Sequence, residues 1–238
     1  MGKPEPSPSR DPESKSAPSR RLPHGVILLY EDRDLLVIDK PAGLLSIASG
    51  TERDKTAYWI LAEYLRKKGE KRRPAAVHRL DRDTSGVMVF AKSEMVKKKL
   101  MGSWDKTVAK RSYVALAEGE FTDGQIAGVI DAPLGEDAGG RMVVKKEGVR
   151  AVTRWRLLKS GKGYSLLSLE LETGRRNQIR AHLSFLGHPV AGDMKYQART
   201  NPVKRLCLHA EHISFHHPHD NRLMEFDSPP PPNFKGLF

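Results

Sequence analysis

Residues 78–93 read HRLDRDTSGVMVFAKS, a polar cluster placed directly before an apolar run. Asp81 stands among His78, Arg79 and Arg82, and neighbouring cations favour the ionised form of a carboxylate. An ionised aspartate can act as a covalent nucleophile and needs no metal to do so. The cluster therefore indicates a catalytic site, with Asp81 as its candidate nucleophile.

Two other interpretations apply to the same cluster. Asp81 and Asp83 form an Asp-x-Asp pair, as in magnesium-dependent phosphatases of the haloacid dehalogenase type, which carry Thr two residues later. Here Thr84 follows one position early, and no apolar strand precedes the pair, so the sequence disfavours a phosphatase. The plainer interpretation, accepted for Asp83, is that Asp83 and Thr84 shape the turn into a strand at Gly86.

A tract near the C-terminus is rich in potential metal ligands, with Cys207 followed by five histidines. On a strand, alternation places Cys207 and His209 on one face and His212 and His216 on the other. Because those side chains would not converge, zinc is disfavoured.

The chain of 238 residues carries 41 Lys and Arg against 29 Asp and Glu, a formal net charge of +12. Such an excess attracts an anionic partner, and nucleic acid is the leading candidate. The basic residues fall in five segments without a recognised binding motif. These segments are residues 66–73, 97–99, 106–111, 143–150 and 174–180.

Composition sets the remaining limits. Residues 1–23 hold six prolines and few large apolar side chains, so we expect a disordered tail ahead of one domain spanning residues 24–238. A single cysteine excludes an internal disulfide, and no apolar stretch approaches the length of a membrane span. We therefore expect a cytoplasmic protein without membrane contact, and the polar composition allows a monomer.

Short apolar runs alternate with turn residues along the chain. Residues 26–30 and 35–39 resemble a hairpin, and residues 86–93, 112–119, 151–159, 164–173 and 206–218 are expected strands. Helical spacing predicts helices over 56–69, 93–104 and 174–187. Many strands without steady strand–helix alternation favour an α+β domain around a mixed or antiparallel sheet.

Six segments, taken in order, resemble the RluA-type pseudouridine synthase family over roughly residues 26–227. The most specific is HRLDRDTSG, which matches the family's HRLD-x-x-TSG signature. The others are VIDKPAGLLS (37–46), KRSYVAL (110–116), TGRRNQIRAHL (173–183), GDMKY (192–196) and RLCLHA (205–210). The resemblance implies the pseudouridine synthase fold, with a mixed, largely antiparallel sheet, flanking helices and loops, and a central active-site cleft.

The resemblance also implies the activity: an isomerase that cuts the N1–C1′ bond of a uridine in RNA, turns the base and rejoins it through C5, without metal or cofactor. Asp81 would attack the ribose or promote the equivalent elimination. Tyr113 would stack on the base, and Arg180 would keep the aspartate ionised. RNA or substrate contacts are expected from Lys40, Arg79, Arg82, Thr84, Arg175, Arg176 and Ile179.

The sequence departs from the family pattern at two positions. Asn177 stands where His is usual, and Gln197 stands where Gly is common. Asn can supply one hydrogen-bonding nitrogen of His but cannot titrate, so we expect a structural role and retained activity.

We expect no S4-like RNA-binding module ahead of the domain. Ribosomal and transfer RNA both remain possible substrates. The alternative function is a catalytically silent RNA-binding protein with the same fold.

Overall fold

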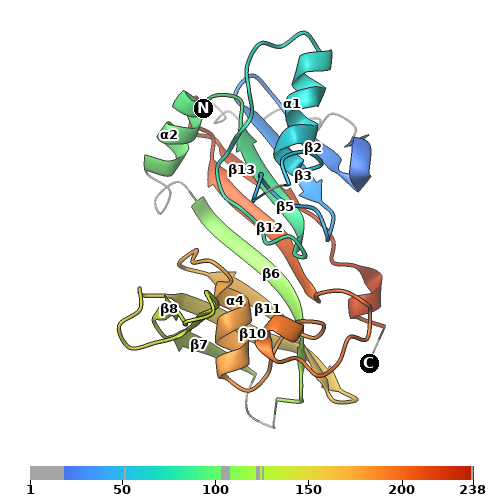
Figure 1. Cartoon of the computed structure of the whole chain (residues 1–238), viewed down its shortest axis with the longest axis vertical. Coiled ribbons are helices and arrows are strands. Elements are labelled where there is room, and N and C mark those ends of the chain that lie inside the picture. Colours follow the sequence, from blue (N-terminus) through green and yellow to red (C-terminus); the bar gives the residue numbers. More distant parts are fainter. Residues whose placement is uncertain (1–18, 51, 103–107, 122–123, 125, 237) are drawn as a thin grey trace, which may run out of the picture.

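The computed structural model describes residues 19–50, 52–102, 108–121, 124, 126–236 and 238. One large sheet organises the chain (Figure 1), with the strand order β1-β2-β3-β5-β12-β6-β11-β10-β7. Two further strands pair outside this path, β4 with β5 and β13 with β12, while β8 and β9 form a separate hairpin. All pairs are antiparallel except β5 with β12.

The strands of the sheet and the hairpin have the following bounds: β1 (Arg20–Arg21), β2 (Ile27–Glu31), β3 (Leu35–Lys40), β4 (Ala75–Ala76), β5 (Ser85–Ala91), β6 (Val108–Glu118), β7 (Ala127–Asp131), β8 (Leu134–Glu136), β9 (Met142–Val144), β10 (Val152–Gly161), β11 (Tyr164–Leu171), β12 (Leu208–His216) and β13 (Leu223–Asp227). The α-helices are α1 (Ala57–Lys67), α2 (Glu94–Gly102) and α4 (Gln178–Phe185). Short 3-10 turns cover Pro23–Gly25, Met194–Tyr196 and Pro232–Phe234.

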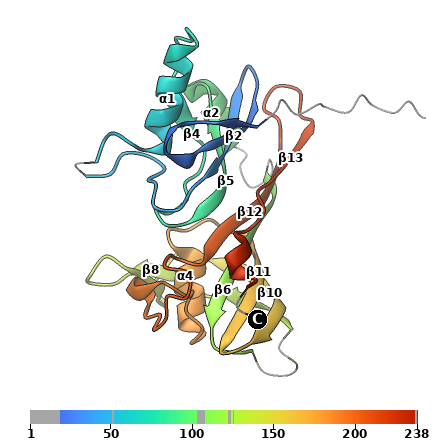
Figure 2. The same cartoon turned by 90° about the vertical axis from the view of Figure 1, so that its right-hand side faces the viewer.

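The sheet divides into two halves, with α1 beside one and α4 beside the other on the same side (Figures 1 and 2). We call β2, β3, β5, α1 and α2 the α1 half, and β7 to β11 with α4 the α4 half. β6 and β12 run through both. In the α1 half, Thr56 caps α1 by accepting a hydrogen bond from the Trp59 amide at 3.1 Å. The helix then buries Ile60, Leu61 and Leu65 against the sheet.

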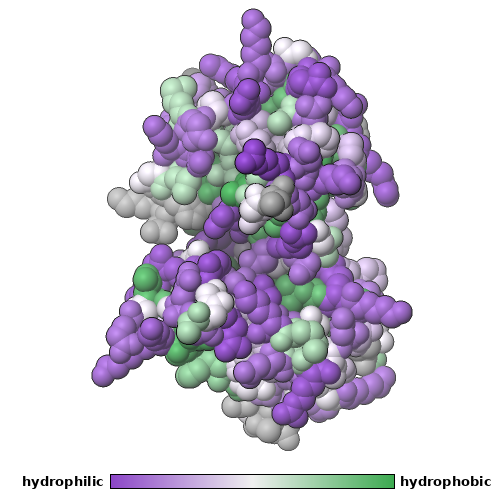
Figure 3. All heavy atoms as spheres, viewed as in Figure 1, coloured by the Kyte–Doolittle hydropathy of each residue, from purple (hydrophilic) through white to green (hydrophobic). Residues whose placement is uncertain are grey.

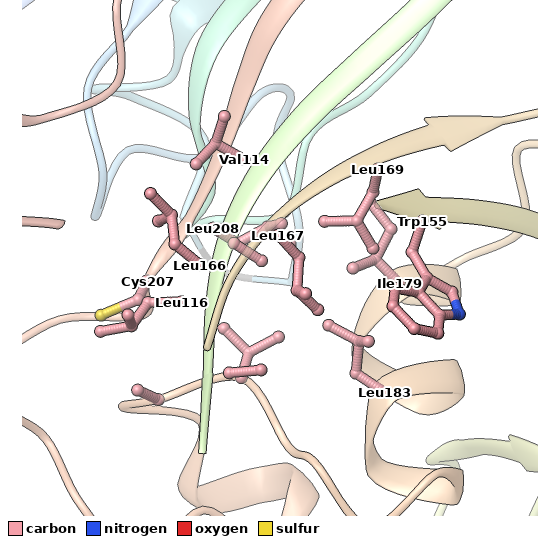
Figure 4. Close-up of a cluster of buried hydrophobic side chains, with 14 of the residues drawn as sticks. Val114, Leu116, Trp155, Leu166, Leu167, Leu169, Ile179, Leu183, Cys207 and Leu208 are labelled. Carbon is pink, nitrogen blue, oxygen red and sulfur yellow. The ribbon is translucent and has the colours of Figure 1, made fainter. Parts of the chain in front are cut away.

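The core of the α4 half lies between α4 and strands β10 and β11. Ile179 and Leu183, one turn apart on α4, point toward Leu167, Leu169 and Trp155 (Figure 4). We expected Ile179 to border the base pocket. Its side chain is 4% exposed and belongs to this core, because the helical spacing that places Leu183 on the sheet places Ile179 there too.

The expected α+β class and the mostly antiparallel sheet are confirmed, and every expected helix and strand has its counterpart. The helix predicted over 174–187 begins only at Gln178, because Asn177 adopts a left-handed conformation with φ 52°. The expected disordered tail lies outside the described residues up to residue 18. Its last part is ordered, since Arg20 and Arg21 pair with Leu28 and Ile27 of β2.

None of the helices in the described part of the chain is both long enough and apolar enough to cross a membrane.

Candidate active site

Asp81 lies in the loop between β4 and β5, which backbone contacts hold in place. The Ser46 hydroxyl donates to the Leu80 carbonyl at 2.6 Å and accepts from the Leu80 amide at 3.2 Å. The Gly43 amide and the Lys40 ammonium both donate to the Arg82 carbonyl, at 2.9 and 3.0 Å. The two residues adjoining Asp81 are therefore anchored by the segment 40–46.

The end of this loop is fixed by the parallel contact of β5 with β12. Gly86 has φ 115°, and a Cβ atom there would lie 2.1 Å from the Ala210 carbonyl oxygen, so only glycine fits. Beside it, the Ser85 hydroxyl contacts Nδ1 of His209 at 2.8 Å and accepts from the Arg205 guanidinium at 2.8 Å. Ser85 and Gly86 of the HRLDRDTSG signature therefore contact Arg205, His209 and Ala210 of the RLCLHA segment, so the two matched segments meet at the end of the loop.

Arg180, on α4, connects two carboxylates. Its Nε and Nη2 atoms donate to Asp193 at 2.6 and 2.7 Å, and its Nη1 donates to Oδ2 of Asp81 at 3.1 Å. The guanidinium also lies over the ring of Tyr196, 4.9 Å from its centroid. Burial alone would lower the pKa of Arg180. The hydrogen bonds to Asp193 and Asp81 and their negative charges have the larger effect, so the pKa of Arg180 lies above its ordinary value.

Asn177 makes the second contact to the candidate nucleophile. Its side-chain Nδ2 donates to Oδ2 of Asp81 at 2.6 Å. Both hydrogen bonds to Asp81 thus fall on one oxygen, and Oδ1 accepts none from any residue that the structure describes. The carboxylate is held from one side and has an oxygen left for chemistry.

Asp81 opens into a cleft of about 1770 Å³ that residues of both halves line. Sites for small molecules are usually about 300–1,000 Å³, so this cleft has room for a macromolecular ligand. Its basic side chains come from both walls, with Arg79 and Arg82 on one and Arg150, Arg175, Arg176 and Lys195 on the other. Hydrophilic residues gather where the molecule narrows between its halves (Figure 3).

Two rings line the cleft near Asp81. Tyr113, on β6, pairs in register with Ala210 of β12 and Leu169 of β11, and so lies at the junction of the halves. Burial raises the pKa of Tyr113, so its phenol stays neutral. Burial, with the nearby charge of Arg111, lowers the pKa of His78 to about 3, and its Nε2 accepts from the Val89 amide at 3.1 Å.

Two residues expected to contact RNA are buried. The Lys40 ammonium is fully buried and donates to the carbonyls of Pro41, Leu44 and Arg82. Burial lowers the pKa of Lys40 to about 7, against the opposing charges of Asp83 and Asp81. Thr84 is 2% exposed, and its amide closes a turn onto the Asp81 carbonyl at 3.2 Å. Neither side chain is available to RNA, and both serve the shape of the loop.

The four arginines expected to contact RNA are exposed and line the cleft. Arg82 pairs with Glu52, and Arg176 pairs with Glu136 and donates to the Gly140 carbonyl. Arg175 donates to the Arg150 carbonyl at 3.1 Å. Exposed pairs of this kind contribute little to stability, so they can exchange for phosphate at small cost.

Asp193, Ser46 and Arg205 carry no function predicted from the sequence. Asp193 belongs to the GDMKY segment, which was matched to the family without a role. Its carboxylate is 2% exposed and takes two of the three nitrogens of Arg180. Gln197, noted as a departure from Gly, has φ 71°, which is the conformation that glycine adopts without strain.

Cys207 directly precedes β12, and His209, His212 and His216 lie on it with separate partners. His209 contacts Ser85 and the Ser228 carbonyl, His212 contacts Asp227, and His216 contacts the Asn221 carbonyl. Within the described residues, no three His, Cys, Asp or Glu side chains are grouped to hold a metal ion.

Comparison with known proteins gives a consistent result. The RNA pseudouridylate synthase family matches residues 34–185. The chain is 37% identical over 214 residues to the uncharacterized RNA pseudouridine synthase YhcT of Bacillus subtilis, covering 88% of this chain and 70% of the relative. It is 35% identical over 226 residues to ribosomal large subunit pseudouridine synthase D of Haemophilus influenzae, covering 88% and 69%.

Solved structures agree with the fold. Human RNA pseudouridylate synthase domain containing 1 superimposes with a TM-score of 0.71 at 24% identity, covering 88% of this chain and 86% of that one. Human RNA pseudouridylate synthase domain containing 4 gives 0.69 at 26% identity, covering 88% and 90%. The pseudouridine synthase fold is confirmed. The chain belongs to the RNA pseudouridylate synthase family and is an isomerase that converts uridine in RNA to pseudouridine.

Proposed function

We propose that Asp81 carries the chemistry of this isomerase, with Arg180 as its charge partner and Tyr113 as the base platform. The observation that carries the proposal is the one-sided hold on the carboxylate. Arg180 and Asn177 both donate to Oδ2, at 3.1 and 2.6 Å, and Oδ1 has no donor among the described residues. A carboxylate held through one oxygen keeps the other available to react.

In the proposed reaction, Asp81 assists cleavage of the bond between C1′ and N1 of the uridine. It does so either by forming a bond from Oδ1 to C1′ or by taking the 2′ proton in the equivalent elimination. The freed uracil carries the electron pair on N1, turns, and bonds to C1′ through C5. In the first route this bond replaces the Oδ1–C1′ bond and frees the carboxylate, and in the second Asp81 returns its proton to C2′. The C5 proton is then released and N1 is protonated, so the net change is an isomerisation.

The target uridine must leave its stack to reach Asp81, which costs a few kcal/mol. Stacking on an aromatic ring returns roughly 1–3 kcal/mol per base. Tyr113 supports this role because its neutral ring lies in the cleft lining between the two halves. The exposed arginines Arg79, Arg82, Arg175 and Arg176 are proposed to bind phosphates on either side of the flipped base.

The RNA class is a further part of the proposal. Relatives named ribosomal large subunit pseudouridine synthase D support ribosomal RNA as the substrate, with transfer RNA as the other candidate. We also propose that residues 24–238 form the catalytic domain, and that it acts as a cytoplasmic monomer. Sedimentation of the pure protein tests the monomer.

The proposal is tested by tritium release from RNA labelled at uridine C5. Deproteinised ribosomal and transfer RNA are incubated separately with wild type and with Asp81→Asn, and filter binding is measured in parallel. Wild type is expected to release tritium from one RNA class. Asp81→Asn should release none while its Kd for RNA stays within about twofold.

The alternative is a silent RNA-binding protein of the same fold. Salt-sensitive binding of both proteins without tritium release from either RNA would favour it. Release by Asp81→Asn at the wild-type rate would instead keep the activity and remove Asp81 from the chemistry.

A further inference from the structure

Asn177 combines an unusual backbone conformation with an unusual use of its side chain. It has φ 52° and ψ 23°, in the left-handed region, and stands at the N-cap position of α4. Among residues other than glycine, Asn, Asp and His tolerate this conformation best. The backbone thus restricts which side chains can occupy the position, and Asn is one of the few.

An Asn at a helix N-cap ordinarily accepts a hydrogen bond from an amide of the first turn, which contributes about 1 kcal/mol. Asn177 makes no such bond. The start of α4 is anchored instead by Gln178, whose Oε1 accepts from Thr173 and from the Arg175 amide. Its Nε2 donates to Val152 and Thr153, so the helix does not depend on the Asn177 side chain.

The amide of Asn177 is directed at Asp81. The distance from Nδ2 to Oδ2 is 2.6 Å, and a carboxylate can only accept, so the donor is the amide nitrogen. Arg180 supplies one nitrogen to the same oxygen, because its other two contacts go to Asp193. One guanidinium contact leaves the carboxylate free to rotate about its bond to Cβ, and a second donor on Oδ2 removes that freedom.

We propose that Asn177 is a positioning residue: it donates to Oδ2 of Asp81 and thereby orients Oδ1 toward the reacting uridine. The inference rests on the proposed function of Asp81. The proposal also explains the left-handed conformation, because that conformation directs the Asn177 side chain away from the helix and toward the Asp81 carboxylate.

The test is a series of variants that all tolerate the left-handed backbone. Asn177→His keeps an N–H donor, Asn177→Gly removes it, and Asn177→Asp removes it in nearly the same shape. Each is assayed by tritium release from the RNA class that wild type converts, with kcat, KM, RNA affinity and Tm measured. Asn221, also left-handed with φ 61° but exposed in the β12–β13 turn, provides Asn221→Gly as the matched control.

We expect Asn177→Gly and Asn177→Asp to lower kcat by roughly 10- to 100-fold, as for the loss of one hydrogen bond to a charged group. KM, RNA affinity and Tm should stay near wild type, Asn177→His should restore most of kcat, and Asn221→Gly should change nothing.

Wild-type kcat in Asn177→Gly would overturn the proposal, as would equal activity of the Asp and His variants. A loss of kcat that only follows a fall in Tm would reduce Asn177 to a structural residue. Failure of the underlying function is distinguishable, because it would appear as an active Asp81→Asn.

Discussion

The two halves of the molecule hold their parts of the site by different means. In the α1 half, Asp81 stands on a loop whose neighbours are fixed through backbone groups, by Ser46 at Leu80 and by Lys40 at Arg82. In the α4 half, Arg180 stands on a helix and is fixed through its own side chain, by Asp193. The anchors of the loop bind backbone groups and leave the Asp81 carboxylate without a hydrogen bond from the described residues of its own half. In the α4 half, Asp193 takes two of the three nitrogens of the Arg180 guanidinium.

This difference separates position from reactivity. Anchors on the backbone determine where Asp81 is without occupying its oxygens, so the group remains able to react. In the proposed reaction Arg180 supplies charge and orientation without reacting, so most of its donors can be used to hold it. Loss of the Arg180 side chain should therefore reduce stability and activity together. Changes in the loop should affect stability or activity according to whether they alter a backbone anchor or the Asp81 carboxylate.

The largest expected effect comes from Arg180→Ala, which breaks the α4 side. It leaves Asp193, 2% exposed, without its cation, and removal of one partner from a buried pair costs about 3–5 kcal/mol. We expect activity to be lost and Tm to fall sharply in thermal unfolding.

Arg180→Lys serves as the control, since it keeps the charge but cannot reach both carboxylates with a planar group. It should recover part of the stability and little of the activity. An unchanged Tm for Arg180→Ala would show that Asp193 does not rely on this contact.

An intermediate effect is expected from Gly86→Ala, at the end of the loop. The added Cβ would meet the Ala210 backbone at 2.1 Å, so β5 and β12 must separate, at a cost above the ~1 kcal/mol of left-handed strain alone. Gly43→Ala is the matched control, because Gly43 has φ 83° but nothing within 4 Å.

The two variants are compared by chemical denaturation and tritium release. If Gly86→Ala and Gly43→Ala lost the same stability, the close contact of Gly86 with the Ala210 backbone would add nothing to the cost of the substitution.

The smallest expected effect concerns His78, in the loop that carries Asp81. The pKa of His78 is about 3 in the folded state, whereas in the unfolded chain the same imidazole has its ordinary pKa of about 6.5. The folded state therefore loses stability as pH falls below 6.5, by at most about 1.4 kcal/mol per pH unit.

His78→Gln keeps an acceptor for the Val89 amide but cannot titrate. The stability difference between wild type and variant, measured by urea unfolding, should shift against wild type between pH 6.5 and 5. A constant difference over that range would show that His78 is not kept neutral by burial.

Much of this architecture could be predicted because it rests on local patterns. Thr56 before an apolar stripe predicts the start of α1, and alternation within residues 164–173 predicts β11. The candidate role of Asp81 came from its local cluster and from motif resemblance, and that of Arg180 from resemblance alone. The structure places the two side chains in contact.

Other features depend on contacts between distant segments. Lys40 and Thr84 are polar, and the sequence predicted that they contact RNA. Their burial follows from how segment 40–46 folds over the loop. The left-handed backbone of Asn177 and the pairing of Asp193 with Arg180 follow from the placement of α4 against the cleft. No periodicity in the sequence encodes such contacts.

The position of β12 in the sheet has a consequence for when the enzyme becomes active. β12 is among the last strands in the chain, yet it lies between β5 and β6, and so closes the sheet at its middle. When β12 pairs with β5, Ala210 comes to lie against Gly86, and Arg205 contacts Ser85. Both contacts are at the end of the loop that carries Asp81. Pairings of such long sequence separation form late. During synthesis, a ribosome-bound chain that ends before β12 can hold the residues of both halves of the site and still lack the strand that joins them, so we expect it to stay inactive until β12 has emerged.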